Sequence, residues 1–178
     1  MSDTSPQKLL LKGKTAVFID YANVYGWRDE LVKPVDPNKL YKYLKTYSQI
    51  ESINFYYGSD SNPQSKNFLT QIKKIGYNLT TKPVKYITIA NIRGKLIKIR
   101  KCDFDIEICM SVYRSIEENY QTFVFFTGDG DFEPIYRYLI EKKKQVLVVY
   151  EHGHLGREIW NIKRGLFKTR FTFLQCQK

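Results

Sequence analysis

Short apolar runs alternate with amphipathic stretches along most of the chain. The runs predict buried strands over 15–19, 53–57, 122–126, 145–150 and 170–174. Between them, apolar residues at helical spacing predict helices from Asp36 to Tyr47, from Pro63 to Gly76, and over 105–118, 131–143 and 154–163. Strands that alternate with helices predict a parallel sheet covered on both faces, so the fold class is α/β.

One stretch breaks this alternation. Residues 80–100 alternate apolar and polar positions around Asn91-Ile92-Arg93-Gly94, which predicts an extended chain that doubles back in a hairpin. The same stretch is rich in basic residues, and Tyr86 lies among them. Strands of this kind hold their charges on one face. That arrangement suits contact with a phosphate backbone better than it suits an amphipathic membrane helix. A merely solvated basic surface is the simpler interpretation.

The composition narrows the class of protein. The chain has 178 residues, 43% of them hydrophobic, which suits a single domain over 14–178 after a flexible lead-in at 1–13. Its formal net charge of +11 admits a nucleic acid, an anionic membrane or an acidic protein as partner. No run of 18 apolar residues and no leader pattern is present, so we expect a soluble, cytoplasmic protein without a membrane partner. The three cysteines lack C-x-x-C spacing and are expected to be reduced thiols.

Carboxylates follow two of the predicted strands directly. Asp20 ends the first strand, and Asp129 and Asp131 follow the run Thr122–Phe126. Ligands of an open parallel sheet gather at the carboxyl ends of its strands, so these side chains are expected at one edge. Asp105, at the start of its helix, joins them if that helix begins at the same edge. Such hard oxygen ligands select Mg²⁺ or Mn²⁺ over zinc.

Each carboxylate also has a purely structural interpretation. Asp131 and Asp105 can serve as N-caps of the helices that follow them. Asp20, with Asn23 three residues later, can form an Asx turn. Taken singly these positions indicate little, whereas three chain segments with acids at strand ends favour a site.

Three motifs carry a resemblance to a known family. They are Phe18-Ile-Asp20-Tyr-Ala-Asn23, Lys101-Cys-Asp-Phe-Asp105-Ile-Glu107 and Thr127-Gly128-Asp129-Gly-Asp131-Phe132, and their order and separations resemble those of the NYN domain family, most closely its LabA-like branch. The resemblance spans about residues 14–175, with Leu155–Ile159 and the chain to Phe173 similar to the family's closing segment. It implies a PIN-like (Rossmann-like) three-layer sandwich with a central, mainly parallel sheet and helices on both faces.

The resemblance also implies an activity, that of a Mg²⁺- or Mn²⁺-dependent ribonuclease acting on single-stranded or structured RNA. By motif position Asp20, Asp105, Asp129 and Asp131 match the family's acidic cluster, and Asn23 and Thr127 match its polar accompaniment. One position departs from the pattern. Many members carry a further Asp six residues after the position of Asp105, where this chain has Ser111. Glu107 and Asp103 are the nearby acids that would compensate.

The working hypothesis is metal-assisted hydrolysis of a phosphodiester, with a cation held by Asp20, Asp129 and Asp105. Asp131 would orient or deprotonate a water, Asn23 would hydrogen-bond a ligand carboxylate or the phosphate, and Gly128 and Gly130 would leave room for substrate. Tyr86, Tyr21 or Trp27 would stack on bases. Basic residues would hold the RNA backbone: Lys85, Arg93, Lys95, Lys98, Arg100 and Lys101.

The rival hypothesis is a non-catalytic nucleic-acid-binding or regulatory module of the same fold, which Ser111 favours. His152 and His154 lie just after a predicted strand, at the same edge as the carboxylates. They would touch substrate on one interpretation, and on the simpler one they are ordinary surface histidines. The aromatic content, 14 Tyr and 11 Phe, is compatible with a homodimer face as well as with a core.

Overall fold

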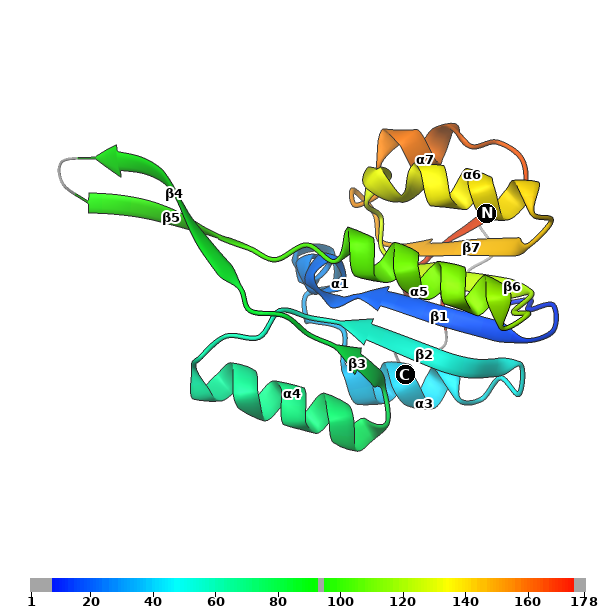
Figure 1. The fold of residues 1–178 in the computed structure, drawn as a ribbon, viewed down its shortest axis with the longest axis horizontal. Coiled ribbons are helices and arrows are strands. Elements are labelled where there is room, and N and C mark those ends of the chain that lie inside the picture. Colours follow the sequence, from blue (N-terminus) through cyan, green and yellow to red (C-terminus); the bar gives the residue numbers. More distant parts are fainter. Residues whose placement is uncertain (1–7, 93–94, 175–178) are drawn as a thin grey trace.

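Six parallel strands form one central sheet in the computed structural model, which describes residues 8–92 and 95–174. The spatial order is β3-β2-β1-β6-β7-β8, and every neighbouring pair is parallel (Figure 1). This confirms the predicted α/β fold with a mainly parallel sheet. The strands are β1 (Thr15–Asp20), β2 (Ile50–Tyr56), β3 (Asn78–Thr80), β6 (Thr122–Phe126), β7 (Gln145–Tyr150) and β8 (Leu166–Arg170).

Helices cover both faces of the sheet. Successive side chains of a strand point to opposite faces, so Val17 and Ile19 of β1 enter one core cluster and Phe18 enters the other. The first cluster packs under α1 (Tyr21–Gly26), α3 (Pro37–Leu44) and α4 (Pro63–Ile75). The second packs under α5 (Asp105–Glu117), α6 (Glu133–Glu141) and α7 (Arg157–Asn161). A single turn, α2 (Arg28–Leu31), follows α1.

The residues predicted to begin and end two of the helices do so in the structure. The carboxylate of Asp36 accepts hydrogen bonds from the backbone N–H groups of Asn38 (2.8 Å) and Lys39 (3.3 Å), and Pro37 begins α3. Gly76 ends α4 with a φ of 110°, a conformation that favours glycine. These local rules confirm the predicted helices near Asp36 and Pro63.

The C-terminal third differs from the prediction. The final strand is β8, over Leu166–Arg170, and the segment predicted as a strand over 170–174 is mostly a 3-10 turn, Phe171–Phe173. The reason is the length of the neighbouring strand, because β8 pairs with β7 only as far as Tyr150↔Arg170. Phe171 and Leu174 are apolar because they pack into the first core cluster.

Two predicted helices are also shorter than expected. The helix predicted over 131–143 is a 3-10 turn, Gly130–Phe132, followed by α6, which ends at Glu141. The helix predicted over 154–163 is α7, five residues long. Before α7, the backbone N–H of Gly156 donates to the Gly128 carbonyl (2.7 Å), so a contact between two loops replaces the first turn of the predicted helix.

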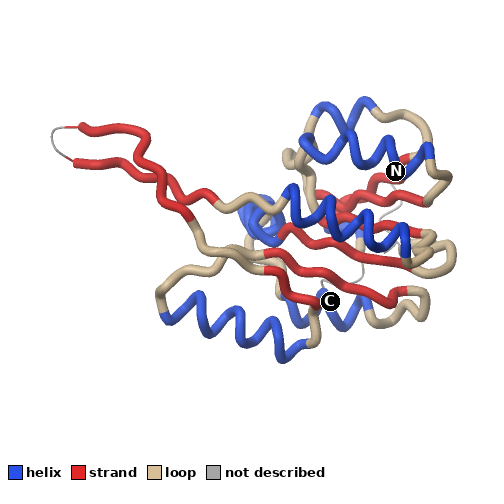
Figure 2. The backbone as a smooth tube through the Cα atoms, viewed as in Figure 1, coloured by secondary structure: helices blue, strands red, loops and turns tan. Residues whose placement is uncertain are grey.

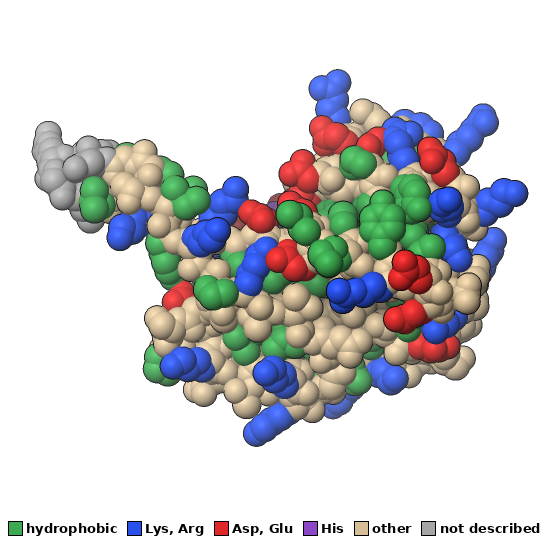
Figure 3. All heavy atoms as spheres, in the orientation of Figure 1, with side chains coloured by type: hydrophobic (Ala, Val, Ile, Leu, Met, Phe, Trp, Pro, Cys, Tyr) green, Lys and Arg blue, Asp and Glu red, His purple; other side chains and the backbone are tan. Residues whose placement is uncertain are grey.

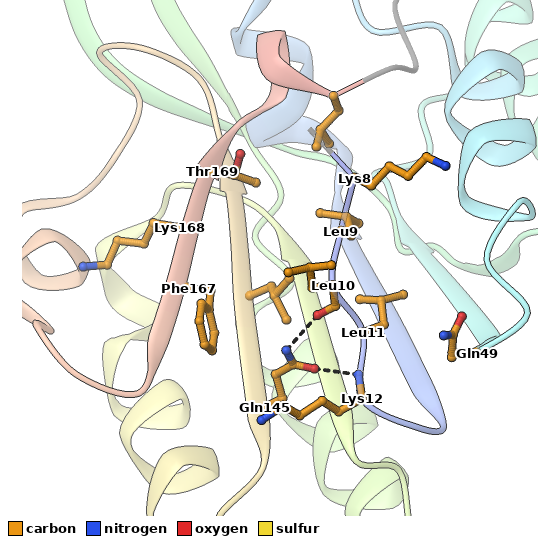
Figure 4. Close-up of a pocket in the computed structure, with 12 residues that line it drawn as sticks. Lys8, Leu9, Leu10, Leu11, Lys12, Gln49, Gln145, Phe167, Lys168 and Thr169 are labelled. Carbon is orange, nitrogen blue, oxygen red and sulfur yellow. Dashed lines mark hydrogen bonds between the residues drawn. The ribbon is translucent and has the colours of Figure 1, made fainter. Parts of the chain in front are cut away.

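Residues 8–12 pack against the sheet. The backbone N–H of Lys12 donates hydrogen bonds to Gln145 Oε1 (2.8 Å) and Thr122 Oγ1 (3.1 Å), and Leu9 is buried in the first core cluster. Figure 4 shows this segment at one wall of a hollow of about 480 Å³, with Phe167 on the other side. The part of the expected flexible lead-in that the structure describes is therefore held by the domain.

The predicted hairpin is confirmed and stands apart from the sheet. Strands β4 (Lys85–Ile92) and β5 (Lys95–Lys101) pair antiparallel with each other and with no other strand. Figures 1 and 2 show them extending well beyond the body of the domain; we call these two strands the arm. Arg93 and Gly94, at its turn, lie outside the described residues. Within the described ranges, no helix is both long and apolar enough to cross a membrane.

Candidate active site

The strand order reverses between β1 and β6. The chain builds β2 and β3 on one side of β1, and β6, β7 and β8 on the other. Because β1 and β6 are parallel neighbours with Ile19 opposite Phe126, Asp20 and the segment after Phe126 leave the sheet side by side. The gap beyond such a reversal is the usual ligand site of an open α/β sheet.

Asn23 fastens the two segments together at this point. Its side-chain oxygen accepts hydrogen bonds from the backbone N–H of Gly128 (3.1 Å) and from Trp27 Nε1 (3.2 Å). Asp20 caps α1 by accepting the N–H of Asn23 (3.3 Å), so the Asx turn foreseen for Asp20 is present. The oxygen that accepts this hydrogen bond is Oδ1.

The loop after β6 is held by its own side chains. Thr127 Oγ1 accepts the N–H of Asp129 (3.2 Å), and Asp129 Oδ1 accepts the N–H of Asp131 (3.0 Å). Asp129 therefore caps the 3-10 turn, and the interpretation of Asp131 as an N-cap is wrong. The Asp131 side chain is exposed, which suits a group that meets substrate or water.

Two loops interlock here so closely that only glycine fits. A Cβ on Gly128 would lie 1.4 Å from the carbonyl oxygen of His154, and the N–H of Gly156 donates to the Gly128 carbonyl at 2.7 Å. A Cβ on Gly130 would lie 2.4 Å from Glu158 Oε2. This contact places the Glu158 carboxylate beside the acidic loop. Glu158 is a residue that sequence reasoning missed. Its only signal was its place in the closing segment 155–159.

Asp105 joins the same region from a third segment. It is the first residue of α5, whose cap position is Phe104 and has no side-chain hydrogen bond, so Asp105 does not cap its helix. Burial raises the pKa of Asp105, and the carboxylates of Asp129, Asp103 and Asp131 raise it further. Asp105 is therefore near enough to Asp129 and Asp131 to interact with both electrostatically.

The carboxyl group of Asp20 also has a raised pKa. Burial raises the pKa of Asp20 from 3.8 to about 6, and the neighbouring charges of Asp129 and Asp105 add to the rise. A carboxylate that is hard to ionise alone becomes easy to ionise beside a cation. The electrostatic potential at this edge is therefore suited to a positive ligand.

A buried tyrosine lies beneath the acids. Tyr136 is fully buried, and its hydroxyl has no hydrogen-bond partner among the described residues. Burial raises the pKa of Tyr136 well above its usual value, and the charges of Asp129 and Asp20 contribute. An orphaned buried hydroxyl next to carboxylates points to a water or ion that completes the site. The sequence offered no signal for it, because its position on α6 follows only a core pattern.

The acids do not form a closed ligand set as they stand. Across residues 8–92 and 95–174, no three His, Cys, Asp or Glu side chains converge tightly enough to hold a metal ion. The four carboxylates, which come from three segments, repel one another when no counter-charge lies between them. The donor chemistry is nevertheless that of a hard cation such as Mg²⁺ or Mn²⁺.

Ser111 lies elsewhere on α5. Its hydroxyl donates to the Glu107 carbonyl (2.9 Å), and it lines a polar hollow with Asn54 and Arg114. Glu107 does not compensate for it, because Lys82 Nζ binds both Glu107 carboxylate oxygens at 2.7 and 2.8 Å. Asp103 is exposed and paired with Lys101 at 3.6 Å.

The basic residues predicted to hold RNA lie mainly on the arm. Lys85 and Lys98 are exposed and make no ion pair with any described residue, whereas Lys101 pairs with Asp103. Arg100 is tied to the body, since its guanidinium donates to the Gly58 carbonyl (3.4 Å) and lies over the Tyr57 ring. Of the other two, Lys95 begins β5 and Arg93 lies outside the described residues. Figure 3 shows acidic side chains close to the base of this basic arm.

The prediction of aromatic residues that stack on bases is wrong for two of the three residues. Tyr21 is buried against Phe55 and Phe68, and Trp27 is fully buried, so neither offers a free ring. The sequence pattern did not place either ring in the core, because no helix was predicted over Tyr21–Gly26. Tyr86 is 54% exposed, and its hydroxyl donates to Asp60.

The two histidines lie on the loop after β7. His152 is exposed, and its Nδ1 is 3.8 Å from Glu30. His154 lies between α1 and the acidic loop, where its ring faces Gly26 and its carbonyl faces Gly128. His154 therefore borders the site through its backbone, as part of the wall against which the acidic loop rests.

Comparison with known proteins agrees with this fold. The family model of the NYN domain matches residues 14–161. The chain belongs to the NYN domain family. The low amplitude and bright protein LabA of Synechococcus elongatus is 29% identical over 150 residues, covering 83% of this chain and 79% of LabA. A crystal structure of a protein of unknown function from Vibrio parahaemolyticus has the same fold, with a TM-score of 0.68 and 20% identity over 94% of this chain and 99% of that one.

Family membership gives the site a general meaning. NYN domains are a PIN-like nuclease family and generally bind nucleic acid. Membership of this family therefore supports a role in nucleic-acid chemistry. The matched range contains all four acids, Asn23 and the whole arm.

The interlocked loops generate a first prediction. Gly128→Ala should lower the free energy of unfolding by roughly 3 kcal/mol, because its Cβ would overlap the His154 carbonyl. The matched control is Gly26→Ala in α1, where the nearest atom to the new Cβ is 3.9 Å away and no loss is expected. Urea denaturation of both variants measures the difference; equal stabilities would contradict the close contact.

The raised pKa of Asp20 generates a second prediction, about stability and pH. The folded protein binds this proton more tightly than the unfolded chain, so its stability falls as the pH rises from about 4 to about 6 and stays lower above that. Asp20→Asn keeps the N-cap but removes the charge. In EDTA at pH 7.5 it should therefore be more stable than the wild type, by on the order of 2 kcal/mol.

The advantage of Asp20→Asn should shrink as the pH is lowered and vanish near pH 4, where the native carboxyl is protonated. Thermal melts at several pH values follow it. An advantage that does not depend on pH would show that the charge of Asp20 is not the cause.

Proposed function

We propose that the chain is a metal-dependent ribonuclease that hydrolyses RNA phosphodiester bonds with Mg²⁺ or Mn²⁺. The observation that carries this is the meeting of Asp20, Asp105 and Asp129, from three segments, at the reversal of strand order, where the charge of Asp129 contributes to the raised pKa of both Asp20 and Asp105. Family membership supports a nuclease, and the basic arm supports a polyanionic substrate.

The residues present fit a hard cation. Asp20, Asp105, Asp129 and Asp131 supply only carboxylate oxygens, and the orphaned hydroxyl of Tyr136 leaves a place for a water of its shell. When bound, the metal would polarise a phosphoryl oxygen and lower the pKa of a bound water. Asp20, Asp105 and Asp129 would hold it, and their mutual repulsion would be relieved.

The chain's own groups would then position the reactants. Asp131, exposed on its turn, would orient the attacking water and accept its proton. The amide nitrogen of Asn23 has no acceptor within the described part of the chain, and its oxygen is already used, so the nitrogen is free to donate to the scissile phosphate. Asn23 would thus bind substrate with one end of its amide and hold Gly128 with the other.

The arm would bind the RNA backbone. Lys85 and Lys98 have no ion pair to break among the described residues, and Tyr86 offers an exposed ring near them. Phosphate contacts of this kind add affinity with little sequence preference. Substrate choice would then rest on the shape of the RNA that fits between arm and body.

A second candidate is a nucleic-acid-binding module without catalysis. It is favoured by the open spacing of the acids and by Ser111, whose hydroxyl is engaged with Glu107 away from the acidic loop. Such a module would hold RNA equally well in EDTA and would never shorten it.

Replacing Asp129 by Asn tests the catalytic proposal. The variant keeps the cap on the 3-10 turn, because an amide oxygen also accepts the N–H of Asp131, but it removes one charge from the site. Cleavage of RNA in Mn²⁺ should fall by roughly a thousandfold, as for loss of a group that stabilises the transition state. The matched control is Asp29→Asn, an exposed acid on α2.

Gel assays with labelled RNA, with Mn²⁺ or EDTA, follow the products. Full cleavage by Asp129→Asn, or cleavage by the wild type in EDTA, would refute the proposed site. Binding without any cleavage by the wild type would select the binding module.

The arm makes a separate prediction. Lys98→Gln should weaken RNA binding severalfold and reduce the slope of log affinity against log salt by about 0.7, the value for one lost phosphate contact with a single strand. Lys74→Gln on α4, an equally exposed lysine away from the arm, should leave both unchanged. Fluorescence anisotropy at several salt concentrations measures them, and equal slopes for the two variants would remove the arm from the RNA interface.

A further inference from the structure

The arm has two chemically different faces. Residues directly opposite each other on antiparallel strands share a face. Ile87 pairs with Ile99 and Ala90 with Ile97, which makes one face apolar; we call it the isoleucine face. The other face, which we call the basic face, carries the pairs Tyr86↔Arg100 and Thr88↔Lys98, whereas the pair Lys85↔Lys101 lies at the base of the isoleucine face. The arm is therefore amphipathic, although no other strand and no helix of the described chain covers its apolar side.

The isoleucine face is open to solvent. Ile87, Ile97 and Ile99 are 42%, 38% and 44% exposed, and Ile89, at the irregularity in the pairing, is 57% exposed. A lone two-stranded hairpin is marginally stable in water, and it needs packing on one face to persist. An exposed apolar face of this size marks an interaction surface. Contact with RNA phosphates does not bury the isoleucines, because phosphates contact charged side chains and not aliphatic ones.

A second apolar surface lies on the body. Ile106, Met110 and Tyr113 are 74%, 51% and 47% exposed and recur at i, i+4 and i+7, so they form one stripe along the outer side of α5. The Tyr113 ring lies 5.3 Å from that of Tyr138 on α6, which widens the stripe. Figure 3 shows this patch of hydrophobic side chains facing outward over α5.

Charge makes these two surfaces complementary. Residues 85–101 contain six Lys or Arg and no acid. Helix α5 carries Asp105, Glu107 and Glu117 against one Arg114, so it keeps a net negative charge even after the pairing of Glu107 with Lys82, in a chain whose net charge is +11. Two arms packed on each other would bring like charges together, whereas an arm on α5 would bring opposite charges together.

The arm does not reach its own α5. Strand β5 runs back to the body and leads through only three residues, 102–104, into the start of α5, so the arm points away from the stripe (Figures 1 and 2). A second copy of the chain supplies what each surface lacks. Two reciprocal contacts related by a twofold axis bury both arms and both stripes.

We propose that the protein is a homodimer in which the isoleucine face of each arm packs on the α5 stripe of the other copy. A stable interface buries about 1,200 Å² or more in total, and the reciprocal arrangement doubles the area of one contact. The basic face of each arm stays exposed in this dimer and remains available to RNA. The dimer does not depend on whether the acids are catalytic, and its test does not measure activity.

The first test compares matched variants of the two faces of the arm. The variant Ile87→Thr/Ile97→Thr/Ile99→Thr keeps β-branched residues that suit a strand but makes the isoleucine face polar. The control, Leu96→Thr, makes the same kind of change outside this face, since Leu96 pairs with Asn91 and is 53% exposed. Met110→Lys changes the stripe on α5.

Sedimentation velocity of the full chain gives the result. The wild type and Leu96→Thr should have twice the chain mass of 21.1 kDa. The triple variant and Met110→Lys should dissociate more than about tenfold more readily, because apolar anchors at the centre of an interface carry most of its energy. A wild type that is monomeric at tens of micromolar overturns the proposal, and so does a triple variant that stays dimeric.

A cross-linking experiment then tests which surfaces meet. A benzophenone amino acid in place of Ile97, in a mixture of isotope-labelled and unlabelled chains, should form intermolecular cross-links to residues 105–117. Cross-links from arm to arm would overturn the proposed contact. Weaker RNA binding by the triple variant at unchanged mass would assign the isoleucine face to RNA and overturn it as well.

Discussion

The parallel pairing of β1 with β6 is the constraint on which the site depends. Pairing Ile19 with Phe126 sends Asp20 and the acidic loop out of the sheet next to each other. Asn23 then fixes their relative position by accepting the N–H of Gly128. The second loop presses on the first at Gly128, which closes the back of the site. The acids are therefore held by backbone contacts, so their mutual repulsion cannot simply push the segments apart.

That rigidity has an electrostatic consequence. Burial and nearby negative charges raise the pKa of Asp20 to about 6, and they raise that of Asp105 as well. Because the fold holds these carboxylates close together, their ionised forms repel one another. A bound cation would relieve that repulsion. The unpartnered hydroxyl of Tyr136 belongs to the same region, since the charges of Asp129 and Asp20 reach it. The site is acidic inside a basic protein, and the arm carries much of the opposite charge.

The sequence predicted what depends on local rules and on strand order. The apolar runs located β1, β2, β6 and β7 but not β3, the pair Asp36-Pro37 located the start of α3, and the strand-end rule placed Asp20 and Asp129 at one edge. Contacts between distant segments left no local pattern. The pairing of Glu107 with Lys82 and the approach of Glu158 to Gly130 are examples, and the end of β8 was misplaced because its partner strand sets it. The alternation in the arm predicted a hairpin, but its projection into solvent required the structure.

The central claim is that the acids at the reversal of strand order bind a divalent cation. A crystal structure of the full chain grown with millimolar Mn²⁺, with anomalous data collected near the manganese edge, tests it most directly. The account predicts an anomalous peak between Asp20 and Asp129, with Asp105 drawn toward it. Crystals that show no peak at this edge of the sheet, with the four carboxylates unmoved, would contradict it.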